Sequence, residues 1–138
     1  MVHATLIGPD RNLNADFLRV LSEIGGPPVR VVENYPERED LWRELHDTQP
    51  TLIFASSDSV ADCVELTRVI RQTTPNVPVI AIGRSPDAET LTGLINAGVR
   101  EFLGAPFPEC VVHAALGRYN DGYGDSCRDR RHIDRPGF

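Results

Sequence analysis

The side chains that could carry chemistry in this sequence gather at the ends of short apolar stretches. Ser56 and Ser57 follow "TLIFA", and Arg84 and Ser85 follow "VPVIAIG". Two hydroxyls, a cation and the start of a following helix could hold an anion or a small ligand. A serine nucleophile would need a base within reach, but the four histidines are scattered and lack metal-ligand spacing. These residues indicate a binding protein rather than an enzyme, with a small-ligand sensor as one open alternative.

Five apolar stretches alternate with five amphipathic ones up to about residue 118. The apolar stretches predict strands at 3–7, 29–33, 51–56, 77–83 and 99–103. The amphipathic ones predict helices, and the first of them is expected to begin at Asn12 as its N-cap. Strands that alternate with crossover helices predict an α/β fold with a parallel sheet covered on both faces. Because ligands of such sheets bind at the carboxyl ends of the strands, function is expected there.

Composition and charge limit the class of protein. The chain has 138 residues, 41% of them hydrophobic, and a formal net charge of −6, which fits one globular domain and argues against nucleic-acid binding. No apolar run approaches the roughly 18 residues of a membrane span, and "MVHATLIGPD" lacks the pattern of a secretory signal. Three cysteines without a CxxC pair suit a cytoplasmic protein. Residues 119–138 are charged and glycine-rich, so a linker or tail is expected after a domain at 1–118.

The segments "PVIAIG" (78–83), "AGVREFL" (97–103) and "APF" (105–107) give the chain a recognisable pattern. In this pattern it resembles the receiver domain of two-component response regulators, over residues 2 to about 118. The resemblance implies a flavodoxin-like (βα)5 fold, a doubly wound parallel sheet with strand order 2-1-3-4-5. It also places Phe102 at the position of the switch aromatic, where a fixed packing residue is the favoured alternative, and implies a cis peptide bond before Pro106.

Receiver chemistry needs five residues, and the sequence replaces every one of them. Two acids after the first strand hold Mg²⁺, an Asp ending the third strand accepts the phosphoryl group, a Ser or Thr ends the fourth strand, and a Lys precedes the proline after the fifth. The matching positions here are Gly8 and Pro9, Ser56, Gly83 and Ala105. The resemblance therefore implies a pseudo-receiver that binds proteins without phosphorylation and without a metal or cofactor.

Two aspartates keep a second hypothesis open. Asp10 stands one position after the expected acid pair, and Asp58 two positions after the expected acceptor. A true phosphorelay receiver could use Asp58 as a displaced acceptor and Asp10 for the metal. A site displaced by an ångström loses its geometry, so the pseudo-receiver is the favoured hypothesis.

The atypical receivers that begin the TadZ/CpaE proteins of Flp-type (Tad) pilus assembly are also similar, including "AGVREFL" followed by a proline loop. In that family the pseudo-receiver precedes a MinD/ParA-like ATPase and helps to place the pilus machine at a cell pole. This chain contains no GKT-type phosphate loop. It could be the front part of a longer protein, a stand-alone relative, or the regulatory domain of a response regulator.

Receivers dimerise through the face of the fourth helix, fifth strand and last helix, which implies a homodimer here. The candidate interface residues on this face are Leu91, Leu94, Ile95, Val99, Arg100 and Glu101. The apolar residues among them also fit a core, and the last two could form ion pairs between subunits. A pilus-assembly ATPase or an output domain is the other kind of partner expected.

Overall fold

The computed structural model describes residues 3–119, and these residues alternate strictly between strands and helices. The elements are β1 (Ala4–Ile7), α1 (Arg11–Glu23), β2 (Val29–Val32), α2 (Arg38–Thr48), β3 (Leu52–Ser56), α3 (Val60–Thr73), β4 (Val79–Gly83), α4 (Ala88–Ala97), β5 (Glu101–Gly104) and α5 (Glu109–Tyr119). The expected tail lies outside the described residues from position 120 onward. No helix within residues 3–119 has the length and apolar character needed to cross a membrane.

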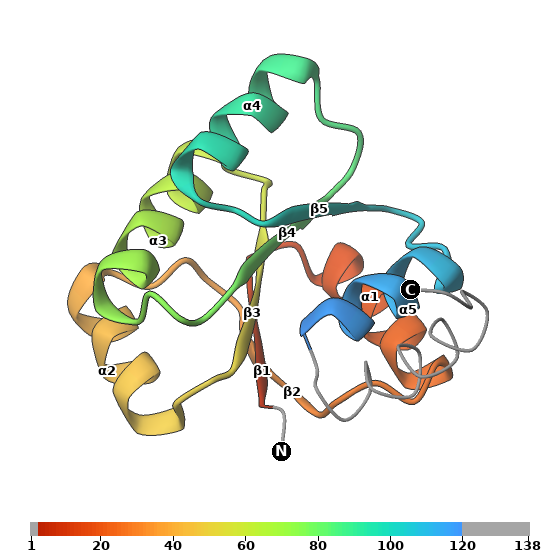
Figure 1. The fold of residues 1–138 in the computed structure, drawn as a ribbon, viewed down its shortest axis with the longest axis horizontal. Coiled ribbons are helices and arrows are strands. Elements are labelled where there is room, and N and C mark those ends of the chain that lie inside the picture. The colour runs from red at the N-terminus through yellow and green to blue at the C-terminus, as the bar shows by residue number, and fades with distance from the viewer. Residues whose placement is uncertain (1–2, 120–138) are drawn as a thin grey trace, which may run out of the picture.

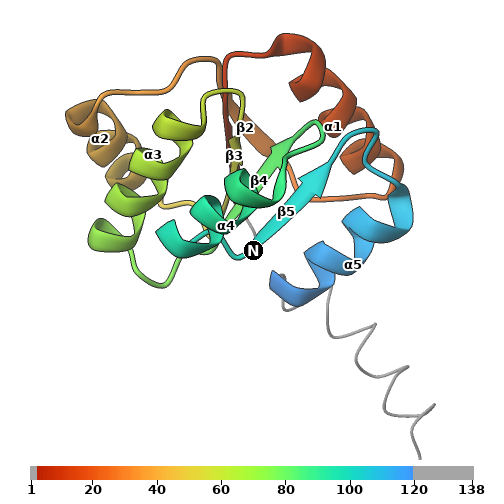
Figure 2. The ribbon, with the colours of Figure 1, turned by 90° about the horizontal axis from the view of Figure 1, so that it is seen from above.

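The sheet is parallel throughout, and its strand order is β2-β1-β3-β4-β5. This confirms the flavodoxin-like order implied by the resemblance. α1 and α5 cover one face, while α2, α3 and α4 cover the other (Figure 1 and Figure 2). β3 and β4 are buried along their whole length because helices lie on both sides, which explains their uninterrupted apolar sequences.

Three aromatic rings connect the centre of the sheet to the loop after β5. Phe17 of α1 packs edge-on against Phe54 and Phe107, with ring centroids 4.7 and 5.0 Å away. Phe107 keeps a positive φ of 59°, which a bulky residue adopts only under strong constraint, and its ring is buried. The Ala105–Pro106 peptide bond is cis, as the resemblance implies. The proline loop thus turns Phe107 back into the core just before α5 begins.

β5 starts two residues later than expected, because Val99 belongs to the turn that closes the C-terminal end of α4. Gly98 adopts a left-handed conformation with φ 118°, and the Val99 N–H donates to the Leu94 carbonyl at 3.1 Å. This closure is typical of a helix that ends on glycine. Leu94 and Val99 are only 0% and 3% exposed, so they belong to the core. Their expected place on an interface surface is therefore corrected.

Candidate functional site

The carboxyl ends of β1 and β3 bring Gly8 and Ser56 into direct contact. Both residues are buried. A Cβ atom added to Gly8 would lie 2.3 Å from the Cβ of Ser56, far inside the 3.5–4.0 Å at which carbon atoms pack. Ser56 therefore occupies the space that a side chain at position 8 would need, while the neighbouring Pro9 is exposed.

The end of β4 is equally crowded. A Cβ atom added to Gly83 would lie 2.2 Å from Ser57 Oγ and 3.2 Å from Cζ of Phe102. Ser57 is fixed there, because its N–H and its hydroxyl both donate to the Ile82 carbonyl, at 2.8 and 3.1 Å. The half-buried ring of Phe102 thus rests against the position where a receiver carries its hydroxyl residue.

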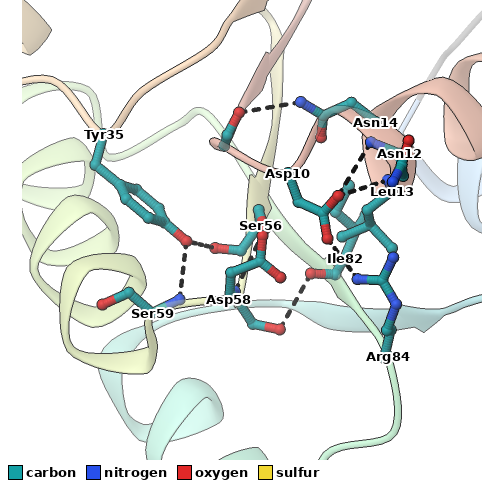
Figure 3. A network of polar contacts seen from close by, with 12 residues as sticks. Asp10, Asn12, Leu13, Asn14, Tyr35, Ser56, Asp58, Ser59, Ile82 and Arg84 are labelled. Atoms are coloured by element: carbon teal, nitrogen blue, oxygen red, sulfur yellow. Dashed lines mark hydrogen bonds and ion pairs between the residues drawn. The ribbon is translucent and has the colours of Figure 1, made fainter.

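Tyr35, in the loop after β2, fixes the segment that joins β3 to α3. Its hydroxyl donates to the Ser56 carbonyl at 2.6 Å and accepts the Ser59 N–H at 3.2 Å (Figure 3). Burial raises the pKa of the Tyr35 hydroxyl, so it remains a neutral donor. Tyr35 is not among the site residues predicted from the sequence. The one feature of the sequence that could have indicated it is its position, since Tyr35 is an aromatic residue that follows a predicted strand at the carboxyl edge of the sheet.

Asp10 is the N-cap of α1, and this corrects the assignment of Asn12. One of its carboxylate oxygens accepts the N–H groups of Asn12 and Leu13, both at 3.0 Å. The other oxygen pairs with the Arg84 guanidinium at 2.5 Å, which joins the start of α1 to the loop after β4 (Figure 3). The Leu13 N–H and then the Arg84 guanidinium lower the pKa of Asp10. Both oxygens of this acid are therefore engaged within the chain.

Asp58, the alternative acceptor, lies on the exposed side of this network. Its backbone N–H donates to Ser56 Oγ at 3.3 Å, and its side chain faces solvent. The hydrogen bond between Arg84 and Asp10 is the largest cause of the raised pKa of Arg84, and the charge of Asp58 adds to that rise. Within residues 3–119, no group of three or more His, Cys, Asp or Glu side chains is placed to hold a metal ion.

Ala105, the residue that follows β5, contributes packing and backbone contacts. The Ala105 N–H donates to the Gly83 carbonyl at 2.8 Å, and its methyl group packs against the core beneath α1 and α5. Pro106 beside it is exposed. The positions that correspond to a receiver's site residues thus lie together at the carboxyl edge of the sheet, as predicted. The residues that stand there are small and pack closely against one another.

The expected interface face is smaller than the sequence suggested. Leu91 and Ile95 on α4 remain exposed, at 37% and 47%, and Arg100 is exposed beside them. Glu101 forms a two-pronged ion pair with Arg118 of α5, so its charge is already matched within the chain.

Four cavities of about 320 to 460 Å³ lie elsewhere on the described surface. None of these four is lined by Asp10, Ser56 or Arg84. The two that adjoin each other follow the groove between α2 and α3.

Comparison with solved structures identifies the fold. A CheY-like protein, TadZ of Pseudomonas aeruginosa, is 17% identical with a TM-score of 0.73, over 87% of this chain and 100% of that one. A response regulator of Thermotoga maritima is 18% identical with a TM-score of 0.73, over 86% and 97%. The receiver domain of a Pseudomonas aeruginosa sensor histidine kinase, which has magnesium coordinated in its active-site cleft, is 20% identical with a TM-score of 0.69, over 86% and 96%. No family model and no curated protein matches the sequence. The chain has the fold of a CheY-like receiver domain.

Proposed function

We propose that this domain is a pseudo-receiver, a receiver fold that binds proteins without being phosphorylated and without catalysing a reaction. The observation that carries the proposal is the crowding at Gly8 and Gly83. A side chain at either position would overlap Ser56 or Ser57 by more than an ångström relative to ordinary packing. The scaffold is thus retained, while the acid and the hydroxyl residue that a receiver carries at positions 8 and 83 are absent and could not be added without moving neighbouring atoms.

The remaining charges at this edge support the same proposal. Asp10 is the acid nearest to the expected metal position along the sequence, but it caps α1 and pairs with Arg84. A guanidinium at this place already neutralises the carboxylate that a divalent cation would need. The closed network also leaves Arg84 engaged, which weakens the small-ligand alternative.

Partner proteins would meet the α4–β5 face, which we define as Leu91, Ile95 and Arg100 with Val111 of α5. The three apolar side chains are between 37% and 47% exposed, and Arg100 is exposed as well. Exposed apolar side chains with an exposed arginine among them are typical of a protein-binding surface. The partner would be an output domain or, given the likeness to solved structures of proteins named for pilus assembly, a component that assembles or localises a pilus in the cytoplasm. The module would also pair with a second copy of itself, through a surface other than the α4–β5 face.

A phosphoryl mimic tests the proposal directly. Amide NMR spectra of the chain with Mg²⁺ and beryllofluoride should match the spectrum without them, and intact mass should not change after incubation with acetyl phosphate. The magnesium-binding receiver of a sensor histidine kinase serves as the positive control. A saturable shift or an added phosphoryl group that Asp58→Asn abolishes would instead establish Asp58 as the acceptor.

A further inference from the structure

The helices α2 and α3 lie side by side on the face of the sheet opposite α1 and α5 (Figure 1). A groove runs between them. It contains two adjoining cavities, of about 390 and 460 Å³, that share Arg38 and Val69. The smaller is lined by the loop before α2, the start of α2 and the N-terminal part of α3. The larger is lined by the first half of α2 and the C-terminal half of α3. The smaller has an apolar floor with acids around it, and its lining includes Tyr35, Leu41, Leu66, Glu37, Asp62 and Glu65.

The larger cavity presents an exposed aromatic side chain. Trp42 of α2 is 53% exposed, and its ring stacks on His46 one turn later, with centroids 5.3 Å apart and planes 3° from parallel. Arg43 lies beside it. A tryptophan presented in a fixed orientation on a helix is the kind of residue that anchors protein interfaces.

The outer face of α3 carries a charge pattern that is complementary to itself. Ala61, Glu65, Arg68 and Gln72 are spaced by four, three and four residues, so they form one stripe along the helix. Arg68 has no ion-pair partner within residues 3–119, and Glu65 forms only an exposed pair with Arg38 at 3.1 Å. If two copies of α3 lie antiparallel, each Glu65 meets the Arg68 of the other copy.

We propose that the α2–α3 face pairs with the same face of a second copy, around a two-fold axis that crosses α3 between Glu65 and Arg68. The same rotation carries Trp42, which lies level with the C-terminal half of α3, over the smaller cavity of the other copy. The acids at that cavity would complement the charge of Arg43, which lies next to Trp42 on α2 and would be placed over the same cavity. Each copy thus gives one tryptophan and receives one, as a two-fold interface requires.

The surface lies apart from the α4–β5 face and leaves that face open for other proteins. The inference rests on the proposed function, because it names the surface through which the module pairs with itself. The exposed ion pairs beside the two-fold axis would set orientation, and the two tryptophans would supply most of the affinity.

The oligomeric state of the full 138-residue chain tests the inference, measured by sedimentation equilibrium over a range of concentrations without any phosphodonor. We expect a dimer that Trp42→Ala weakens on the order of ten-fold or more. Glu65→Arg alone and Arg68→Glu alone should each weaken it, because each places like charges opposite each other twice. An equimolar mixture of these two variants should dimerise again, since the charges become complementary.

Two matched variants serve as controls. Arg19→Glu makes the same charge change as Arg68→Glu, but on α1 behind the sheet, and Ile95→Glu alters the α4–β5 face. Both should leave the dimer intact, and a thermal melt of each variant verifies folding. A chain that is monomeric at every concentration, or a dimer lost with Ile95→Glu but not with Trp42→Ala, overturns the inference. Neither result bears on phosphorylation, which the beryllofluoride experiment decides separately.

Discussion

Gly8 and Ser56 are packed so closely that the chain has no room for a methyl group between them: the added Cβ would lie 2.3 Å from the serine Cβ. A serine can turn its hydroxyl away from a neighbour, but its Cβ is fixed by the backbone. The clash can be relieved only by moving β1 against β3, two strands in the middle of the sheet.

Gly8→Ala should therefore destabilise the domain by about 1–3 kcal/mol, the usual cost of overpacking a core. Urea unfolding measures the change. Gly93→Ala is the matched control, because nothing lies within 4 Å of an added Cβ at this α4 position and alanine favours a helix. It should stabilise the domain slightly. Adding Ser56→Gly to Gly8→Ala should recover part of the loss, and strictly additive effects would contradict the contact.

Asp10 joins α1 to the loop after β4, and its two roles can be separated by substitution. Asp10→Ala removes the N-cap and the ion pair and should cost about 1 kcal/mol. Asp10→Asn keeps a capping oxygen, and Arg84→Ala removes only the half-exposed ion pair, so both should cost less. Equal losses in all three variants would contradict a capping role for Asp10.

The same residue predicts a response to acid. The Leu13 N–H and Arg84 hold the pKa of Asp10 below its ordinary value of 3.8 in the folded state. The folded state therefore binds this proton less readily than the unfolded chain, and the stability gained above pH 3.8 is lost as the pH falls through the lower folded pKa. Asp10→Asn should lose less stability than the native chain between pH 5 and pH 2, as measured by urea unfolding.

Tyr35→Phe removes a hydroxyl that serves two backbone groups of the β3–α3 segment. The loss should be about 1 kcal/mol, because the Ser56 carbonyl and the Ser59 N–H lose a common partner. Hydrogen exchange at the Ser59 amide should become faster. Burial raises the pKa of the hydroxyl, so ionisation above pH 10 favours the unfolded state. The native chain should thus lose more stability above pH 10 than Tyr35→Phe, and identical alkaline profiles would contradict its burial.

The sequence was sufficient to predict the fold because periodicity and order are local properties. The apolar runs "LIFAS" and "VIAIG" are typical of strands covered on both faces, and their alternation with helices leaves few topologies. The positions at which the receiver residues are replaced could also be identified from the sequence. The contacts that fill the site were not, because Asp10 and Arg84 lie 74 residues apart and their pairing depends on where two loops meet. Whether an apolar residue faces the core or solvent is also decided by tertiary packing, as Ile95 near the end of α4 and Val99 just after it show.

Ile95 and Val99 test that last distinction. Ile95 is 47% exposed and Val99 is 3% exposed, although the sequence analysis placed both on one surface. Val99→Glu would bury an unpaired carboxylate beneath α3 and α4 and should cost several kcal/mol, enough to unfold a domain of ordinary stability. Ile95→Glu places the same charge in water and should change the free energy of unfolding by no more than about 0.5 kcal/mol. Circular dichroism with urea titration measures both. Similar losses in the two variants would contradict this orientation of α4. The α4–β5 face would then have to be redefined from the residues that remain exposed.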